Sequence, residues 1–414
     1  MNKKLLVIIL VFAIPLFSIA QNRDLNYFID NSVINNPLST QSQNLILANS
    51  IDSQLIVAAN KFQITGNGNA YYAPVLNGYG YDAAITNGQQ LSALVAITKQ
   101  INNKRNLGLQ FKDLQLQKDS LNISSAISRQ DIRKAIVNQY IITYGDQLQL
   151  DFNDEVINLL TNEEAILKKL AQQNVYKQAD YLSFLVTLQQ QQLTRNQLFV
   201  QYKNNYATLN YLAGIIDTTT ATLNPPDIEV VKNFDKANSP FFLNYKIDSL
   251  RILNQRSIVD VGYRPKINLF ADAGYQSSFI LTPYKNFGYN VGINLSIPIY
   301  DGHQKQLQYS KLNIAERTRE KQKEFFSKQF QQQIQQLEQQ LNDLNNLAGP
   351  INQQIKYLQT LIQVNGKLLE TGDIKITDYV LALNNYITSK NLVVQNKIAR
   401  YFVIHQLNYW NLKQ

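Results

Sequence analysis

The sequence predicts an α+β membrane protein, in which a duplicated chain of long antiparallel helical hairpins carries four β-strands. The first observation is a repeat. A Tyr- and Gly-rich strand pattern contains Pro74, and Pro265 opens a second strand pattern 191 residues later. In both halves another alternating strand follows, and then two long stretches rich in Gln and Asn. These features predict one intertwined fold rather than several globular domains.

The first 20 residues have the organisation of a secretory signal peptide. Lys3 and Lys4 precede an apolar run that ends in small residues, so cleavage is expected before Gln21. The alternative, an uncleaved anchor helix, is disfavoured because the run is short and Pro15 interrupts it. No later stretch reaches the roughly 18 apolar residues of a spanning helix, so a membrane-embedded mature chain would have to form a closed barrel.

Composition excludes several classes of site. The chain has no cysteine, which excludes disulfides, thiolate metal sites and cysteine nucleophiles. Its formal charge of +9 is spread along the chain without a basic block, which disfavours nucleic acid as a partner. Only 17% of the residues are charged, whereas Gln, Asn and Tyr are abundant. Long helices with uncharged polar faces suit a water-filled wall better than a compact enzyme surface.

The first half is expected to begin with a helix over residues 25–64, with Pro37 near its start and the Gly- and Asn-rich residues 65–69 at its end. A strand is predicted over residues 71–82, and a second strand over residues 89–98. In the second strand apolar side chains alternate with mostly polar or small ones.

The second half shows the clearer strand pair, over residues 266–275 and 287–299. One face of each strand is apolar and the opposite face is small or polar. Barrel strands with lipid outside and water inside have this pattern over about 9–11 residues. The alternative is a strand of a soluble sandwich, but four strands cannot enclose a core beside such long helices.

Long helices account for most of the remaining chain. Residues 302–347 contain no proline, and five apolar residues recur there with the 4-3-4-3 spacing of a coiled-coil seam: Phe330, Ile334, Leu337, Leu341 and Leu344. Residues 348–350 are predicted to break this helix, which then restarts and runs towards Trp410. The first half repeats the layout, with Gly145 as the expected break.

The repeats are expected over residues of about 22–216 and 241–414, with a Thr- and Pro-rich connector over about 217–240. Four residues mark the repeats and their helix breaks: Pro74, Pro265, Pro298 and Gly372. Four strands per chain are too few for a bacterial barrel, which closes with eight or more. Closed cyclic symmetry therefore predicts a homotrimer with a 12-stranded barrel, a layout expected of a channel.

Three segments, residues 263–269, 291–302 and 370–380, resemble the TolC-like outer-membrane efflux protein family. The second carries the family's strand–Pro–aromatic–Asp–Gly pattern, from Pro298 to Gly302. The resemblance implies a trimer with its barrel in the outer membrane of a Gram-negative-type cell and an α-helical tunnel in the periplasm. It also implies an exit duct for efflux or type I secretion, which docks a periplasmic adaptor (membrane fusion) protein and an inner-membrane RND or ABC pump.

The same resemblance suggests a periplasmic gate. The family's constriction is lined by an acid six residues after a glycine, which here is Asp378 after Gly372. Asp180 follows Asn174 at the same spacing in the first half, and Lys375 is a candidate partner for it. A ring of three Asp378 side chains would favour cations and raise the pKa values of these carboxyl groups by mutual repulsion. The alternative is that both acids are ordinary solvated residues of a helix N-terminus.

The remaining candidates are aromatic residues of the strands, two histidines and possible catalytic motifs. Six aromatic residues are expected to form interfacial girdles on the membrane strands: Tyr71, Tyr79, Tyr81, Tyr275, Phe287 and Tyr289. The only two histidines, His303 and His405, have no metal-ligand spacing. We find no catalytic triad, paired carboxylates or phosphate loop, so neither an enzyme nor a cofactor is expected.

Two functions therefore remain. The first is the trimeric outer-membrane exit duct, in contact with outer-membrane lipid. The second is a secreted periplasmic coiled-coil scaffold or adaptor without a membrane barrel. The apolar alternation from Phe287 to Ile299 favours the duct, because a soluble scaffold has no reason for so apolar a strand face.

Overall fold

The computed structural model describes residues 23–82, 88–101, 104–231, 239–278 and 285–410, so the signal-peptide prediction lies outside the described residues. The elements follow in the order α1 (Leu25–Asn35), α2 (Pro37–Ala59), β1 (Gln63–Tyr72), β2 (Gln89–Ile101), α4 (Lys104–Gln172), α5 (Gln178–Leu212), α6 (Pro240–Gly262), β3 (Lys266–Ser277), β4 (Phe287–Ser296), α7 (Gln304–Thr371) and α8 (Ile376–Trp410). The chain forms two compact units, and α4 and α7 contribute one segment to each.

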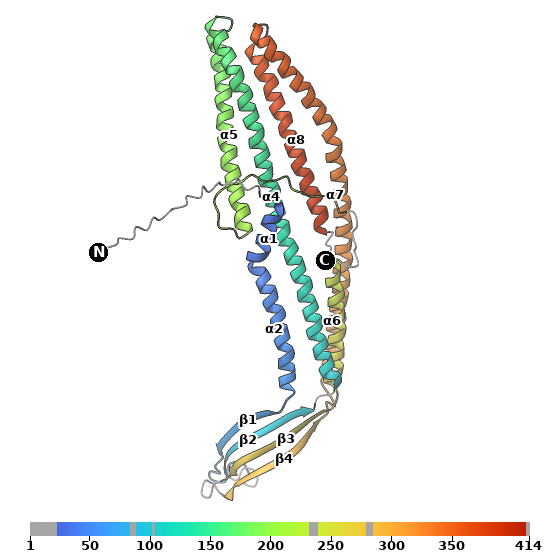
Figure 1. Ribbon diagram of the computed structural model, residues 1–414. Coiled ribbons are helices and arrows are strands. Elements are labelled where there is room, and N and C mark those ends of the chain that lie inside the picture. Colours follow the sequence, from blue (N-terminus) through green and yellow to red (C-terminus); the bar gives the residue numbers. More distant parts are fainter. Residues whose placement is uncertain (1–22, 83–87, 102–103, 232–238, 279–284, 411–414) are drawn as a thin grey trace, which may run out of the picture. The chain divides into compact units, whose positions relative to one another are not determined.

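The first unit comprises α1, α5, α8, the C-terminal parts of α4 and α7, and the described part of the connector. Within it, α4 pairs with α5 and α7 pairs with α8, as two antiparallel hairpins (Figure 1). One apolar core joins all four helices and includes side chains that are fully buried: Leu160, Leu167, Phe184, Leu369 and Tyr379. The predicted long helical hairpins are therefore confirmed.

The predicted coiled-coil seam of α7 is confirmed for four of its five residues, whereas the ring of the fifth, Phe330, packs 5.5 Å from that of Phe242 of α6. Leu337 is buried against Val403 and Leu407 of α8, and three partly buried residues of the seam flank this contact: Ile334, Leu341 and Leu344. These contacts bury the apolar stripe that the 4-3 spacing places on one side of α7.

The hairpin breaks predicted at Gly145 and at residues 348–350 are wrong, because α4 and α7 continue through them. A Cβ atom at Gly145 would lie 3.2 Å from Ile398, so this glycine permits close packing of α4 against α8. Pro350 lies on an exposed face of α7, where water can satisfy the carbonyl that loses its helical hydrogen bond. The chain reverses instead after α4 at Gln172 and after α7 at Thr371.

The described part of the connector is extended and is bound to the first unit by hydrogen bonds. The buried Tyr140 hydroxyl donates to the carbonyl oxygen of Asn224 at 2.7 Å, and the carbonyl oxygen of Arg23 lies 3.1 Å from the same hydroxyl. The Arg23 guanidinium lies 2.8 Å from a carboxylate oxygen of Asp217. This hydrogen-bonded ion pair lowers the pKa of Asp217 to about 2. Residues 217–224 of the connector are thus held against the helices of this unit.

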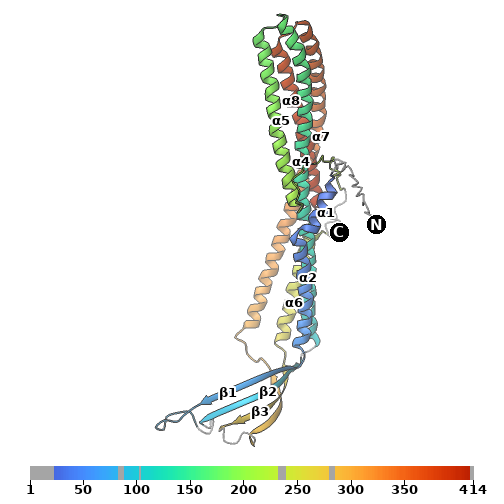
Figure 2. The ribbon, with the colours of Figure 1, turned by 60° about the vertical axis from the view of Figure 1, so that its left-hand side comes forward.

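The second unit comprises α2, α6, the N-terminal parts of α4 and α7, and the β-sheet. Two buried amides hold its helices together: Asn49 donates to the carbonyl of Leu114, and Asn254 donates to the carbonyl of Leu109. In the sheet the order is β1-β2-β3-β4 and every neighbouring pair is antiparallel. Figure 2 shows the sheet from a second direction.

The predicted strands over 89–98, 266–275 and 287–299 correspond to β2, β3 and β4, and β4 ends at Ser296, before Pro298. Proline has no N–H for the ladder, which explains this end. The first predicted strand is wrong: α2 ends at Ala59, β1 covers Gln63–Tyr72, and Pro74 follows the strand instead of lying within it. The Gly- and Asn-rich residues 65–69, which were predicted to end the helix, all pair with β2 instead.

None of the described helices has both the length and the apolar character needed to cross a bilayer.

Candidate functional site

The strand register sorts the side chains of the sheet by polarity. One row of side chains crosses the four strands on one face, because each residue is the direct partner of the next: Ile64, Ile97, Ala271 and Val291. The next row, on the opposite face, consists of Thr65, Ala96, Asp272 and Asn290. The sheet therefore has an apolar face and a polar face, as the alternation in the sequence predicted.

The apolar face is uncovered in this chain. On β4 five successive residues of this face are between 58% and 85% exposed: Phe287, Tyr289, Val291, Ile293 and Leu295. Monomeric soluble proteins rarely expose so continuous an apolar strip, and such strips usually mark an interaction with a membrane or another protein. The polar face offers the hydrogen-bonding groups expected on the water side of a barrel.

Aromatic side chains gather at one end of the apolar face. Tyr275 pairs with Phe287, and Tyr289 lies two residues further along β4 on the same face. Tyr72 lies at this same end of β1, opposite Gln89.

The other predicted girdle residues occupy different places. Tyr71 lies on the polar face, opposite Gln90 of β2. Tyr79 and Tyr81 follow β1 and belong to no strand, so their prediction as strand aromatics is wrong. The reason is the misplaced first strand, since the Tyr and Gly alternation of residues 71–82 lies in the segment after β1.

Both outer strands of the sheet have an unpaired edge. Among the described residues β1 pairs only with β2 and β4 pairs only with β3. The edge of β4 spans ten residues with little charge. An edge of this length and composition is a template for pairing with another strand, and soluble proteins usually protect against it.

The hairpin ends of the first unit share a local sequence that our sequence analysis missed. Lys177-x-x-Asp180-Tyr181 and Lys375-x-x-Asp378-Tyr379 recur 198 residues apart. In both, the N–H of the aspartate donates to the lysine carbonyl at 3.0 Å. A search for short identical patterns between the two halves would have found this repeat.

The chain reverses before each of these patterns through a residue with positive φ. Asn174 has a φ of 56° and Gly372 a φ of 80°. Asn and Gly adopt this left-handed region at the least steric cost, so both residues suit the end of a helix. The spacing of six residues from Asn174 or Gly372 to the aspartate therefore corresponds to a turn followed by the first turn of the next helix.

Tyrosines hold the two hairpin ends together. The Tyr176 hydroxyl lies within hydrogen-bonding distance of the carbonyl oxygens of Leu369 (3.0 Å) and Ile374 (2.9 Å), and its single O–H joins the α4–α5 end to the α7–α8 end. Tyr379 is fully buried and its ring packs 6.4 Å from that of Phe184. The tyrosines of this region therefore belong to the packing of the helices.

The predicted gate residues lie at these ends. Asp378 and Lys375 are exposed, Asp180 is half-buried, and each aspartate is in the first turn of its helix. None of the three makes an ion pair among the described residues, and Asp180 and Lys375 are not paired within one chain. Their position agrees with both the gate and the helix-terminus explanation, so the gate stays a prediction.

The two histidines lie in different surroundings and do not belong to a metal site among the described residues. His405 is buried in α8, with Nε2 3.3 Å from the carbonyl oxygen of Lys134, and burial lowers its pKa to about 4. His303 is exposed and has a φ of 64° just before α7. Across the described part of the chain, no group of three or more His, Cys, Asp or Glu residues could hold a metal ion.

No family model matches the sequence, and no curated protein matches it. Solved structures do match along nearly the whole chain. The outer membrane protein VceC from Vibrio cholerae aligns with a TM-score of 0.73 and 12% identity, over 94% of this chain and 96% of that chain.

The chain has the TolC-like fold of outer-membrane channels. The CmeC outer membrane channel of Campylobacter jejuni aligns with a TM-score of 0.73 and 10% identity, over 93% of this chain and 85% of that chain. The outer-membrane channel OprN aligns with a TM-score of 0.75 and 11% identity, over 93% and 89%. The predicted resemblance is thus confirmed as a fold.

Proposed function

We propose that three copies of this chain form a channel across the outer membrane, which acts as an exit duct for efflux or type I secretion. The observation that carries this proposal is the exposed apolar face of the sheet. The strand register places the polar residues on the opposite face of the same sheet. Four strands cannot close a barrel, whereas three copies supply twelve. Pairing β4 of one copy with β1 of the next would remove every open edge.

The polar face of the sheet would then line the barrel, and the helices of the first unit would form the tunnel in the periplasm. The low charge and the many Gln and Asn residues of the chain fit a wall that passes solutes without binding them tightly. A duct of this kind does no chemistry of its own. A periplasmic adaptor protein and an inner-membrane RND or ABC pump would supply selection and energy.

The alternative is a secreted coiled-coil scaffold. The long hairpins alone are compatible with it, but the exposed strip from Phe287 to Leu295 is not, because a soluble protein would aggregate through it. Retention with membranes after a high-salt wash is expected of the duct, and release is expected of the scaffold.

The duct is tested by conductance in planar bilayers, with the acids at the hairpin ends as the variable. If Asp378 belongs to the gate, Asp378→Ala should raise the closed-state conductance. A ring of Asp378 carboxylates would favour cations, so the same substitution should also lower the preference for K⁺ over Cl⁻. Asp180→Ala should raise the leak as well. Asp343→Ala, an exposed acid within α7, is the matched control and should leave both quantities unchanged.

The two parts of the proposal fail separately. Absence of any channel activity in the unchanged protein would contradict the duct. Channel activity that the Asp378 and Asp180 variants do not change would retain the duct and exclude these acids as its gate.

A further inference from the structure

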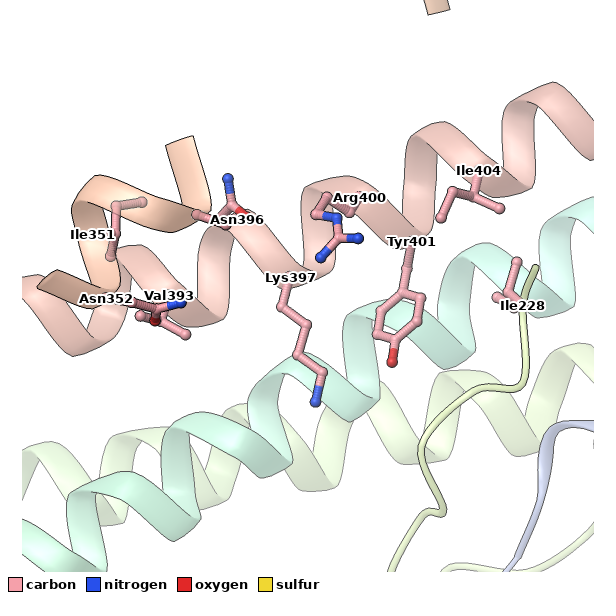
Figure 3. Close-up of a pocket in the computed structure, with 10 residues that line it drawn as sticks. Ile228, Ile351, Asn352, Val393, Asn396, Lys397, Arg400, Tyr401 and Ile404 are labelled. Atoms are coloured by element: carbon pink, nitrogen blue, oxygen red, sulfur yellow. The ribbon is translucent and has the colours of Figure 1, made fainter. Parts of the chain in front are cut away.

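The first unit contains a groove whose lining residues do not belong to the hairpin ends. It lies between α7, α8 and the connector and has a volume of about 350 Å³ (Figure 3). Pockets for small organic ligands typically have volumes of about 300–1,000 Å³. Its apolar lining comes from three separate segments: Ile228 of the connector, Ile351 of α7, and Val393 and Ile404 of α8.

Two cations of α8 line the same groove. Lys397 and Arg400 lie three residues apart and so share one side of the helix, next to Tyr401 (Figure 3). No carboxylate of the described residues lies within 4 Å of either side-chain cation. The groove therefore holds two positive charges that the described chain does not neutralise.

The hydrogen bonds of these cations are also incomplete. Arg400 Nε is buried and has no hydrogen-bond partner among the described residues. Lys397 Nζ lies 3.4 Å from the Tyr144 hydroxyl and 5.4 Å from the centre of its ring, which is a weak contact. A buried donor without a partner is costly, so an acceptor entering the groove would be bound favourably.

We propose that this groove binds an amphipathic organic monoanion, a carboxylate or sulfonate attached to a compact apolar body. The planar Arg400 guanidinium suits the two oxygens of such a group, and Lys397 adds a second positive charge. The isoleucines, Val393 and the Tyr401 ring cover the apolar body, which favours a small amphiphile over inorganic phosphate or sulfate. Every lining residue belongs to one unit of one chain, so the site does not depend on the proposed channel.

The test uses the purified full chain in amphipol and 1-naphthoate as the probe, measured by calorimetry. Neutral 1-naphthalenemethanol and cationic 1-naphthylmethylamine have the same apolar body and serve as matched ligands. We expect saturable binding of one naphthoate per chain, and at least about tenfold weaker binding of the other two compounds.

Variants then locate the site. Lys397→Gln and Arg400→Gln should each weaken naphthoate binding about tenfold or more. Lys356→Gln, which removes an exposed cation of α7 outside the groove, should leave binding unchanged. Arg400→Gln is the cleaner test, since Lys397 also contacts Tyr144; the melting temperature of each variant verifies that it is folded.

Equal binding of all three compounds, or naphthoate binding that neither groove variant changes, would overturn the proposal. A different result would overturn it as well: no naphthoate binding, together with a smaller assembly for Lys397→Gln or Arg400→Gln. That result would show that the groove receives an acidic side chain from a second copy of the chain.

Discussion

Replacing Val291 by Lys tests whether the exposed face of the sheet meets lipid. Val291 is 72% exposed in the chain and lies in the middle of β4, within the row Ile64, Ile97 and Ala271. A lysine at the midplane of a lipid-facing strand costs about 2–4 kcal/mol, and the cost recurs in every copy of a symmetric barrel. In a soluble scaffold the same exposed position would tolerate lysine within about 0.5 kcal/mol.

Asn290→Lys is the control, because Asn290 is adjacent but belongs to the polar row, opposite Asp272. We expect it to change the free energy of unfolding by no more than about 0.5 kcal/mol. The assay is a urea titration of the protein folded into lipid bilayers, followed by the mobility difference between folded and unfolded protein on gels. Equal effects of Val291→Lys and Asn290→Lys, or no effect of either, would refute the assignment of the faces.

Three further predictions concern the helices. Burial lowers the pKa of His405 to about 4, so below pH 6.5 the unfolded chain binds more protons than the folded chain, and the folded state loses stability as the pH is lowered. From pH 7.5 to pH 5 we expect the free energy of unfolding to decrease by about 2 kcal/mol, a decrease that His405→Gln should abolish in melting curves. Leu369→Ala, at a fully buried position, should cost about 2–5 kcal/mol in thermal unfolding, whereas Leu368→Ala, at a position 38% exposed, should cost much less. Gly372 has a φ of 80°, a left-handed conformation that Asn tolerates better than Ala, so Gly372→Ala should cost about 1 kcal/mol or more and Gly372→Asn less; the Cβ contact with Val175 at 2.8 Å is common to both variants, so similar melting temperatures for both would contradict the explanation by φ.

The strands of the second half could be predicted because their pattern is local. From Ile267 to Tyr275 and from Phe287 to Leu295 every second side chain is apolar or aromatic, and the register keeps these residues on one face. Strand β1 could not be predicted in this way, because Gly66 and Gly68 stand where its apolar face would be. Its ladder with β2 overrides the weak local preference of these residues.

The hairpin ends show the limit of reading glycine and proline as breaks. Gly145 serves the contact with Ile398, and Pro350 is tolerated on an exposed face. The true reversals lie at Asn174 and Gly372, where positive φ is needed. The six-residue spacing to Asp180 and Asp378 came from the family resemblance, and the turns that precede these two acids were not predicted.

The groove between α7, α8 and the connector could not be predicted from the sequence. Its lining combines residue 228 with residues 348–352 and 393–404, and only tertiary packing brings these segments together. Neither Lys397 nor Arg400 belongs to a motif, and only the three-dimensional structure reveals that no acid of the described residues pairs with them.

The most direct test of the proposed channel is the mass of the protein extracted with detergent from the outer-membrane fraction, measured by native mass spectrometry. We expect a particle of three chains, because only a shared sheet of twelve strands covers the open edges of β1 and β4. A water-soluble monomer or dimer, absent from the membrane fraction, would contradict it and favour the periplasmic scaffold.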